Sequence, residues 1–248
     1  MRPEARRIEE LSLNSSAPPG QLIYDGWILR LLRGKAKRPR SVNAVYGSTI
    51  PLAEKIPYCE RLYAQAGVPA LFRITPFSDP PELDRELEWR GYERFDETAV
   101  ESATIKGAQP VEGNAQSIEL RTWVDAVGEL RGSPAAHREA HFARIDGMPL
   151  RKLPVAIREG DRIVATGLAV LEDDCVGLFD IITRAEAQRR GLAKTVVATL
   201  LRRGWELGAR HAYLQVQQDN VAARRLYSQF GFAQQYLYWY RGRPGEKE

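Results

Sequence analysis

The residues with the clearest chemical potential in this 248-residue chain are 188–193, with the sequence Gln-Arg-Arg-Gly-Leu-Ala. They follow the apolar, β-branched run 176–183 and precede a helical pattern. A loop that ends a strand and begins a helix directs several free backbone N–H groups at one point, and the helix dipole adds positive charge there. Gly191 lets an anion approach the backbone, and Arg189 and Arg190 add full charges. The segment therefore predicts a phosphate site, most naturally for a pyrophosphate.

Two common phosphate-binding motifs do not match this loop. The nucleotide P-loop requires G-x-x-x-x-G-K-[ST], and Ala193-Lys194-Thr195 imitates only its end. Gln188 and Ala193 occupy the positions of the two required glycines. The dinucleotide fingerprint G-x-G-x-x-G is absent as well. Both motifs are therefore disfavoured.

The segment Gln188–Ala193 resembles the Q/R-x-x-G-x-G/A loop of the GNAT acetyltransferase superfamily. A later segment looks like the second GNAT signature, with these residues at matching spacing: Asp219, Asn220, Ala223, Tyr227, Gly231 and Phe232. The interval between the two segments has the length of one helix and one strand, as in the family. The resemblance covers roughly residues 119–241 and implies an acyltransferase of class EC 2.3.1.-.

The fold that this resemblance implies is α/β, an α+β arrangement around a mixed sheet. The strand 176–183, the helix after the loop and the alternating strand 213–217 form a βαβ unit, so the two strands should be parallel. The resemblance further implies that these strands splay apart. The pantetheine arm of acetyl-CoA then inserts like an added strand and bonds main-chain groups of Ile181, Ile182 and Thr183.

The resemblance assigns the other contacts of the co-substrate acetyl-CoA to two segments. In the loop they are Gln188, Arg189, Arg190, Gly191, Leu192 and Ala193. In the last helix they are Asn220, Ala223 and Arg224. Asn220 is also a favourable N-cap residue, and this structural role is compatible with a cofactor contact.

Tyr227 is the general acid that the resemblance implies, and an ordinary core aromatic is the structural alternative. It lies two helical turns after Asn220 and therefore on the same helix face. In the implied reaction an amine attacks the thioester directly in a ternary complex. An alkylammonium ion, with a pKa near ~10.4, must first lose a proton. A backbone N–H near Ile182 would stabilise the oxyanion, and Tyr227 would protonate the leaving thiolate.

The general base is less well indicated by the sequence. Asp180 lies on the strand 176–183 and is our candidate, although a buried or salt-bridged structural role fits it equally well. Glu129 and Glu139 remain open alternatives. Gln215 and Gln217 cannot act as bases, but they could hold an ordered water.

Residues 123–130 and 134–145 read as two helices. In GNAT proteins the corresponding pair borders the acceptor, so we expect a substrate wall here. His137 and His141 are spaced to chelate a metal on the second helix, with Glu139 between them. The pattern is not H-E-x-x-H and shows no third ligand, so surface histidines are the favoured interpretation and no metal is predicted.

Composition and charge narrow the class of protein. The net charge is +4 and the pI about 9.1, with acids and bases interspersed. This mild basicity suits an anionic cofactor and does not indicate nucleic-acid binding. Two cysteines form no disulfide or metal framework, which fits a reducing, cytoplasmic location. The N-terminus lacks the apolar core of a secretory signal, and no apolar run approaches the roughly 20 residues that span a bilayer.

Three shorter predictions concern the N-terminal part. Residues 1–12 fit a short amphipathic helix, and residues 22–32 read as a hairpin around Asp25-Gly26. Residues 52–67 favour a helix whose regular part begins near Pro57, because proline disrupts a helix interior.

The order of elements predicts an internal duplication. The helix ending at residues 66–67, the strand 70–75, the helix 80–90 and Gly91-Tyr92 repeat the order found before Gly231-Phe232. We therefore expect two tandem GNAT-like units, a degenerate one at 1–107 and the acetyltransferase at 117–248, joined by the Gly/Pro/Asn-rich segment 106–116. The first unit lacks the loop, the asparagine and the tyrosine, so we expect it to be catalytically silent.

Two functions follow from these features. The first is an N-acetyltransferase that transfers an acetyl group from acetyl-CoA to a primary amine of a small molecule or protein. The second is a non-catalytic acyl-CoA sensor or interaction module. Asn220 and Tyr227 together favour the enzyme, because a sensor needs no general acid. The acceptor and the oligomeric state are left open by the sequence.

Overall fold

The computed structural model describes residues 4–34, 36–107, 113 and 115–246. The chain forms two compact units that are interleaved in sequence. The first unit contains the residues up to Ser15 together with Val100–Gln235, and the second contains Ser16–Ala99 together with the chain from Tyr236 onward. Most of the expected linker at 106–116 lies outside the described residues.

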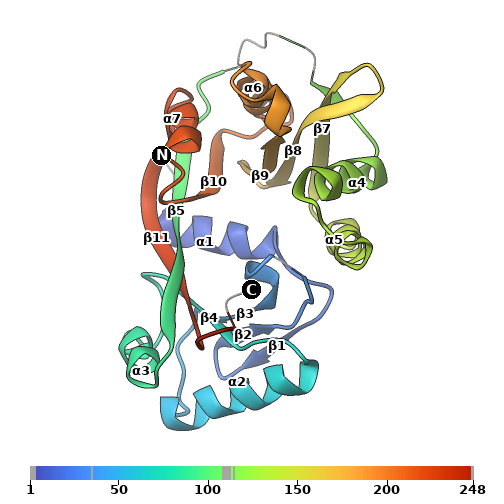
Figure 1. Cartoon of the computed structure of the whole chain (residues 1–248). Helices are drawn as coiled ribbons and strands as arrows, with labels where there is room; N and C mark the ends of the chain where they lie inside the picture. The colour runs from blue at the N-terminus through green and yellow to red at the C-terminus, as the bar shows by residue number, and fades with distance from the viewer. Residues whose placement is uncertain (1–3, 35, 108–112, 114, 247–248) are drawn as a thin grey trace. The chain divides into compact units, whose positions relative to one another are not determined.

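The first unit contains the helices α1 (Ala5–Asn14), α4 (Leu120–Arg131), α5 (Ala135–Asp146), α6 (Leu192–Glu206) and α7 (Val221–Ser228). Its strands are β6 (Gln116–Ser117), β7 (Arg151–Glu159), β8 (Arg162–Glu172), β9 (Cys175–Thr183) and β10 (His211–Gln217) (Figure 1). Two further strands, β5 (Glu93–Thr104) and β11 (Ala233–Gly242), begin in one unit and end in the other. Among the described residues, no helix combines the length and apolarity needed to cross a membrane.

The sheet of the first unit has the strand order β5-β10-β9-β8-β7-β6. The pairs β7–β8 and β8–β9 are antiparallel, whereas β9 and β10 are parallel and are joined through α6. The expected βαβ unit is thus confirmed, and so is the mixed α/β fold class. The parallel pair needs a crossover connection, which the helical pattern after residue 191 supplies.

Helices α4 and α6 cover opposite faces of this sheet. A Cβ atom on Gly167 of β8 would lie 2.4 Å from Cγ1 of Val196, so this position faces α6. The next residue, Leu168, packs with Trp123 of α4 in a separate apolar cluster. Neighbouring strand residues point to opposite faces, which explains the alternation. The Trp123 indole also donates a hydrogen bond of 3.0 Å to the Gly167 carbonyl.

Helix α1 confirms the amphipathic pattern at the N-terminus and packs against the first unit. The hydroxyl of Tyr213 on β10 donates to the Leu11 carbonyl at 3.0 Å. Gln215, also on β10, donates to the hydroxyl of Ser12. The N-terminal helix therefore belongs to the unit that contains β9 and β10, although residues 16–99 separate them in sequence.

The second unit contains β1 (Gln21–Tyr24), β2 (Trp27–Arg30), β3 (Ser41–Ala44), α2 (Leu52–Ala66), β4 (Leu71–Ile74) and α3 (Leu83–Trp89). The β1–β2 hairpin is confirmed. The predicted helix start near Pro57 is wrong, because α2 begins at Leu52 and includes Pro57. Ile56, Cys59 and Tyr63 on α2 are fully buried. Burial of this face outweighs the loss of one helical hydrogen bond.

The two units repeat one strand order. The second has β1-β2-β3-β4-β11, and the first has β7-β8-β9-β10-β5 in corresponding places. In each case an antiparallel hairpin leads to a strand, a helix and a parallel strand. The last strand of each set enters from the other unit. This strand order supports a duplication, which stays a prediction. The consecutive domain boundaries 1–107 and 117–248 also stay predictions. The two compact units of the structure are interleaved in sequence.

The close packing of Gly167 against α6 generates a test. Gly167→Ala adds a methyl group where Val196 is completely buried, so we expect the free energy of unfolding to fall by about 1–3 kcal/mol. Gly20→Ala is the control, because a Cβ there has no neighbour within 4 Å. Urea unfolding measures both. Equal stabilities for the two variants would contradict the described packing of α6 on β8.

Candidate active site

Strands β9 and β10 separate partway along their length. Their register pairs four residues of each strand and ends at Leu178 and Leu214. β9 continues for five residues beyond this point, to Thr183, and β10 continues for three, to Gln217. The expected splay is therefore present. Beyond Leu178, one edge of β9 has backbone groups that β10 does not pair.

A bulge lies where the opening begins. The register between β8 and β9 shifts between Thr166 and Leu168, because Leu168 pairs with Phe179 while Thr166 pairs with Ile182. Asp180 stands inside this bulge with a left-handed φ of +49°. The hydroxyl of Thr166 donates to the Asp180 carbonyl at 3.2 Å and holds the bulge in place. Bulges of this kind redirect a side chain out of the regular alternation.

The open part of β9 suits an extended ligand. Ile181, Ile182 and Thr183 are half-buried; Ile182 and Thr183 pair with β8, and the register with β10 ends before all three. The hydroxyl oxygen of Thr183 is buried and, within the described ranges, has no hydrogen-bond partner. A strand-like ligand with amide groups could satisfy both this oxygen and the unpaired strand edge. The pantetheine arm of a coenzyme A ester has this character.

The loop between β9 and α6 has the conformation that its sequence predicts. Arg189 has a φ of +61°, and Gly191, the N-cap of α6, has a φ of +80°. Within the described residues, no side chain makes a capping hydrogen bond at the start of α6. The first N–H groups of α6 lack an intrahelical partner, as at any helix N-terminus, and can bind an anion. Arg190 forms an ion pair of 2.6 Å with Glu159, whereas Arg189 is exposed.

Helix α7 presents the second signature. The Asn220 side chain accepts a hydrogen bond of 3.1 Å from the Ala223 N–H, so it caps the helix as expected. Tyr227 is 8% exposed, and its ring meets Phe232 edge-on with centroids 6.0 Å apart. Burial, with a smaller contribution from the carboxylate of Glu101, raises the pKa of Tyr227 to about 12. The phenol, like that of any tyrosine, is protonated at neutral pH and can serve as a proton donor.

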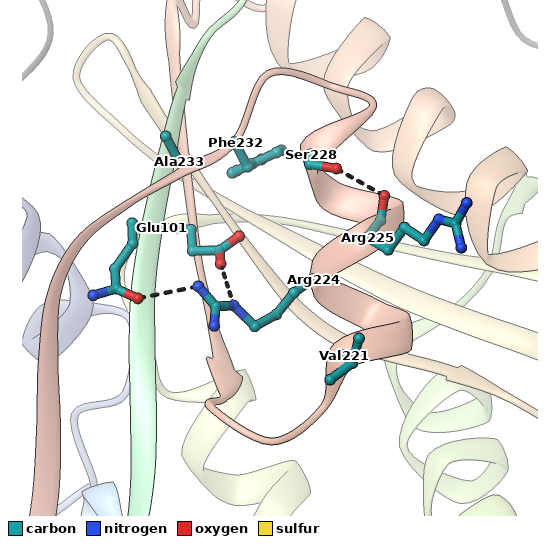
Figure 2. Close-up of a pocket in the computed structure, with 8 residues that line it drawn as sticks. Glu101, Val221, Arg224, Arg225, Ser228, Phe232 and Ala233 are labelled. Atoms are coloured by element: carbon teal, nitrogen blue, oxygen red, sulfur yellow. Dashed lines mark hydrogen bonds and ion pairs between the residues drawn. The ribbon is translucent and has the colours of Figure 1, made fainter.

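Arg224 contacts other residues of the protein. It donates to Glu101 on β5 at 2.9 Å and to Gln218 and Gln234 at 3.0 Å each. Arg224, Glu101 and Gln234 border a cavity of about 340 Å³ on the side of α7 that carries Val221 and Ser228 (Figure 2). Figure 2 shows the Arg224 side chain extending across this cavity toward Glu101. The cofactor contact expected for Arg224 stays a prediction.

Each carboxylate considered as the base contacts an arginine. Glu129 accepts from Arg184 at 2.5 Å, and this hydrogen bond lowers the pKa of Glu129. Glu139 accepts from Arg121 at 2.6 Å, with the same effect on its pKa. A carboxylate stabilised in its charged form is a weaker proton acceptor.

Asp180 is the third such carboxylate. Its Oδ1 accepts from Arg131 at 2.5 Å, and its Oδ2 lies 3.4 Å from Nε2 of His141. Burial raises the pKa of Asp180, but the charge of Arg131 and hydrogen bonding with His141, helped by Arg144, hold it well below its usual range. The predicted catalytic role of Asp180 is untested, and this geometry favours orientation of a neighbour over direct proton abstraction.

His141 is the residue that the sequence did not identify as functional. It contacts Asp180, 39 positions away in the chain, and its ring lies against Trp123. The sequence marked this helix as part of a substrate wall, and for His137 and His141 it favoured surface histidines over a metal site. Within the described part of the chain, no group of three or more His, Cys, Asp or Glu residues could hold a metal ion.

Comparisons with known proteins agree with this geometry. Residues 119–232 match the model of the acetyltransferase (GNAT) family. An uncharacterized N-acetyltransferase of Bacillus subtilis, YobR, is 25% identical over 237 residues, which cover 93% of this chain and 95% of that protein. The segment 119–232, which carries the opened strand pair and the N-terminus of α6, is therefore a GNAT domain, and the protein is an acyltransferase.

Solved structures share the fold along nearly the whole chain. A GCN5-related N-acetyltransferase from Kribbella flavida superposes with a TM-score of 0.66 at 16% identity, covering 97% of this chain and 96% of its own. A second, from Sphaerobacter thermophilus, gives a TM-score of 0.58 at 17% identity, covering 81% of this chain and 71% of its own. At these identities the likeness concerns the fold alone.

The capping role of Asn220 can be separated from a cofactor role. Asn220→Ala removes the hydrogen bond to the Ala223 N–H, so we expect the free energy of unfolding to fall by about 1 kcal/mol. Asn220→Asp retains a capping oxygen and should preserve stability. Thermal unfolding measures both variants. If Asn220→Ala were as stable as the unaltered protein, α7 would not depend on this cap.

Proposed function

We propose that the enzyme transfers an acetyl group from acetyl-CoA to a primary amine of a small molecule or protein, by direct attack within a ternary complex. The observation that carries this proposal is the opening of β9 from β10 directly before the uncapped N-terminus of α6. The open strand edge and the loop lie in succession along the chain. A ligand with an amide-containing arm and a pyrophosphate matches both.

The residues of the loop fit the phosphates of this ligand. Helix α6 supplies outward N–H groups and its dipole, while Gly191 leaves open space beside the backbone. Arg189 supplies an exposed positive charge. Gln188, Arg190, Leu192 and Ala193 complete the predicted contacts of the loop, and Asn220 and Ala223 are proposed to contact the cofactor from the first turn of α7.

Tyr227 is the proposed general acid. Its hydroxyl makes no hydrogen bond among the residues that the structure describes, and its phenol is protonated at physiological pH, as that of an ordinary tyrosine is; burial raises the pKa further. When the amine has attacked, the carbon–sulfur bond breaks and the thiolate takes the phenolic proton. A backbone N–H of the open β9 segment near Ile182 is the proposed oxyanion donor. Neither cysteine is required, and burial raises the pKa of both Cys59 and Cys175 to about 12.

We propose that the second unit does not bind acetyl-CoA. Helix α2 follows β3 as α6 follows β9, but the carboxylate of Asp25 occupies the segment before α2. It accepts the N–H of Thr49 at 2.9 Å and that of Ile50 at 2.8 Å. It also pairs with the buried ammonium of Lys55 at 2.9 Å. An internal anion thus takes the donors that a phosphate would need.

Calorimetric titration with acetyl-CoA tests the binding site. We expect one site per chain, and Arg189→Glu should weaken binding by about 10- to 100-fold, because a charge-assisted hydrogen bond contributes about 1.5–3 kcal/mol. Arg151→Glu is the matched control. Arg151 is exposed and begins β7, whereas Glu159, the partner of Arg190 in the loop, ends that strand. Equal weakening by both changes would mean that net charge, and not the loop, governs affinity. No binding by the unaltered protein would overturn the proposal.

The role of Tyr227 is tested by Tyr227→Phe. We expect kcat for amine acetylation to fall about 10²- to 10⁴-fold, because a positioned acid is lost, while the Kd for acetyl-CoA stays constant. Tyr213→Phe is the control, because that hydroxyl bonds the Leu11 carbonyl and serves packing of α1. Release of free coenzyme A measures the rates. Unchanged turnover in Tyr227→Phe would rule out the acid role.

A further inference from the structure

The imidazole of His141 is held beside the open part of β9. Its Nε2 lies 3.4 Å from Oδ2 of Asp180, and Oδ1 of the same carboxylate accepts from Arg131 of α4 at 2.5 Å. The His141 ring also lies against the fully buried indole of Trp123, with centroids 5.7 Å apart. Trp123 is itself fixed by its hydrogen bond to Gly167. Residues from α4, α5 and β9 therefore restrict the position of one ring.

The bulge explains why Asp180 can reach this ring. Asp180 follows the last β9–β10 pair, at Leu178, by two residues and immediately precedes Ile181. Its left-handed φ of +49° costs about 1–2 kcal/mol in a residue other than glycine. This conformation directs the carboxylate toward α4 and α5. The strained backbone of Asp180 thus accompanies a carboxylate that is directed toward α4 and α5 at the point where β9 separates from β10.

The contact with Asp180 determines which nitrogen of His141 can accept a proton. A carboxylate beside Nε2 favours the tautomer with the proton on that nitrogen, which leaves the lone pair on Nδ1. Among the described residues, Nδ1 makes no hydrogen bond, and 17% of the side chain is exposed. The other charged or titratable groups near this ring are Arg131 on α4, Asp180 on β9, and His137 and Arg144 on α5.

We propose that His141 is the general base that deprotonates the acceptor ammonium, and that Asp180 is the positioning residue that orients its ring. This inference rests on the proposed acetyl transfer. Nδ1 takes one proton from the ammonium and later releases it to solvent. The neutral amine then forms the carbon–nitrogen bond as the carbon–sulfur bond breaks. The thiolate receives the proton of Tyr227, and the second proton leaving the nitrogen restores the phenol, so charges and protons balance.

The alternatives to His141 are less suited to this task. Glu129, Glu139 and Asp180 are each stabilised as carboxylates by an arginine. Gln215 donates to Ser12 on α1 and is not a base. His141 combines an accessible lone pair with a fixed orientation and lies on the helix pair where the resemblance locates the acceptor.

The test uses the full chain, acetyl-CoA and five amine probes: butylamine, ethanolamine, lysine methyl ester, spermidine and glucosamine. With the amine that the unaltered enzyme acetylates fastest, His141→Ala should lower kcat about 10²- to 10⁴-fold and leave the KM for acetyl-CoA unchanged. The kcat of His141→Ala should rise steadily with pH up to the pKa of the amine in use, about 10.4 for a simple alkylammonium ion, because the ammonium must then lose its proton unaided. Added imidazole should restore part of the rate, which a purely structural role would not allow.

Two further variants complete the experiment. Asp180→Asn should lower kcat by up to about 10⁴-fold, because an amide favours the wrong tautomer of the ring. His211→Gln is the matched control, since His211 makes a similar contact of 3.8 Å with Asp174 at the paired end of β9 and β10. It should keep the original pH profile.

The outcomes separate this inference from the proposed function. An enzyme that acetylates an amine but keeps its rate and pH profile in His141→Ala retains the proposed function and overturns the role of His141. A rate loss in His141→Ala that imidazole does not rescue, together with an unchanged pH profile, also overturns the role of His141. A protein that acetylates none of the five amines overturns the proposed function, and this inference falls with it.

Discussion

The separation of β9 from β10 beyond Leu178 is the constraint on which the site depends. Backbone N–H and C=O groups that leave a ladder need other partners, and an unpaired buried group is costly. The protein maintains this opening by holding β9 firmly on its other edge, where β8 pairs with it on both sides of the bulge. Helix α6 on one face and Trp123 on the other fix that pair in place. A ligand that supplies the missing strand completes the sheet.

Charge is distributed unevenly around this opening. Arginines form ion pairs with the carboxylates of Glu129, Glu139 and Asp180, so each of these acidic side chains already has a cationic partner. The tyrosine is protonated at neutral pH and burial raises its pKa further, while a carboxylate orients a histidine. This arrangement assigns proton removal and proton donation to different groups. It also explains why an acidic residue on the correct strand need not be the base.

The two units share a strand order but differ in the segment that precedes the helix between their parallel strands. Both contain a strand, a helix and a parallel strand, yet only the first combines the glycine loop with an opened strand pair. In the second, Asp25 satisfies the N–H groups of Thr49 and Ile50 before α2. One carboxylate of the chain thus replaces an external anion. The exchange of β5 and β11 between the units also gives each one a strand from the other half of the sequence.

The sequence by itself determined the features that depend on neighbouring residues. It indicated the loop before α6, the cap at Asn220 and the parallel βαβ unit, because turn chemistry, capping and hydrophobic periodicity act over a few positions. Only the tertiary structure decided the contact between His141 and Asp180, the engagement of Arg224 by Glu101, and the continuation of α2 through Pro57. Their partners lie far apart in the chain or depend on burial of a whole helix face. Local propensity carries no information about such contacts, which arise when the sheet brings distant segments together.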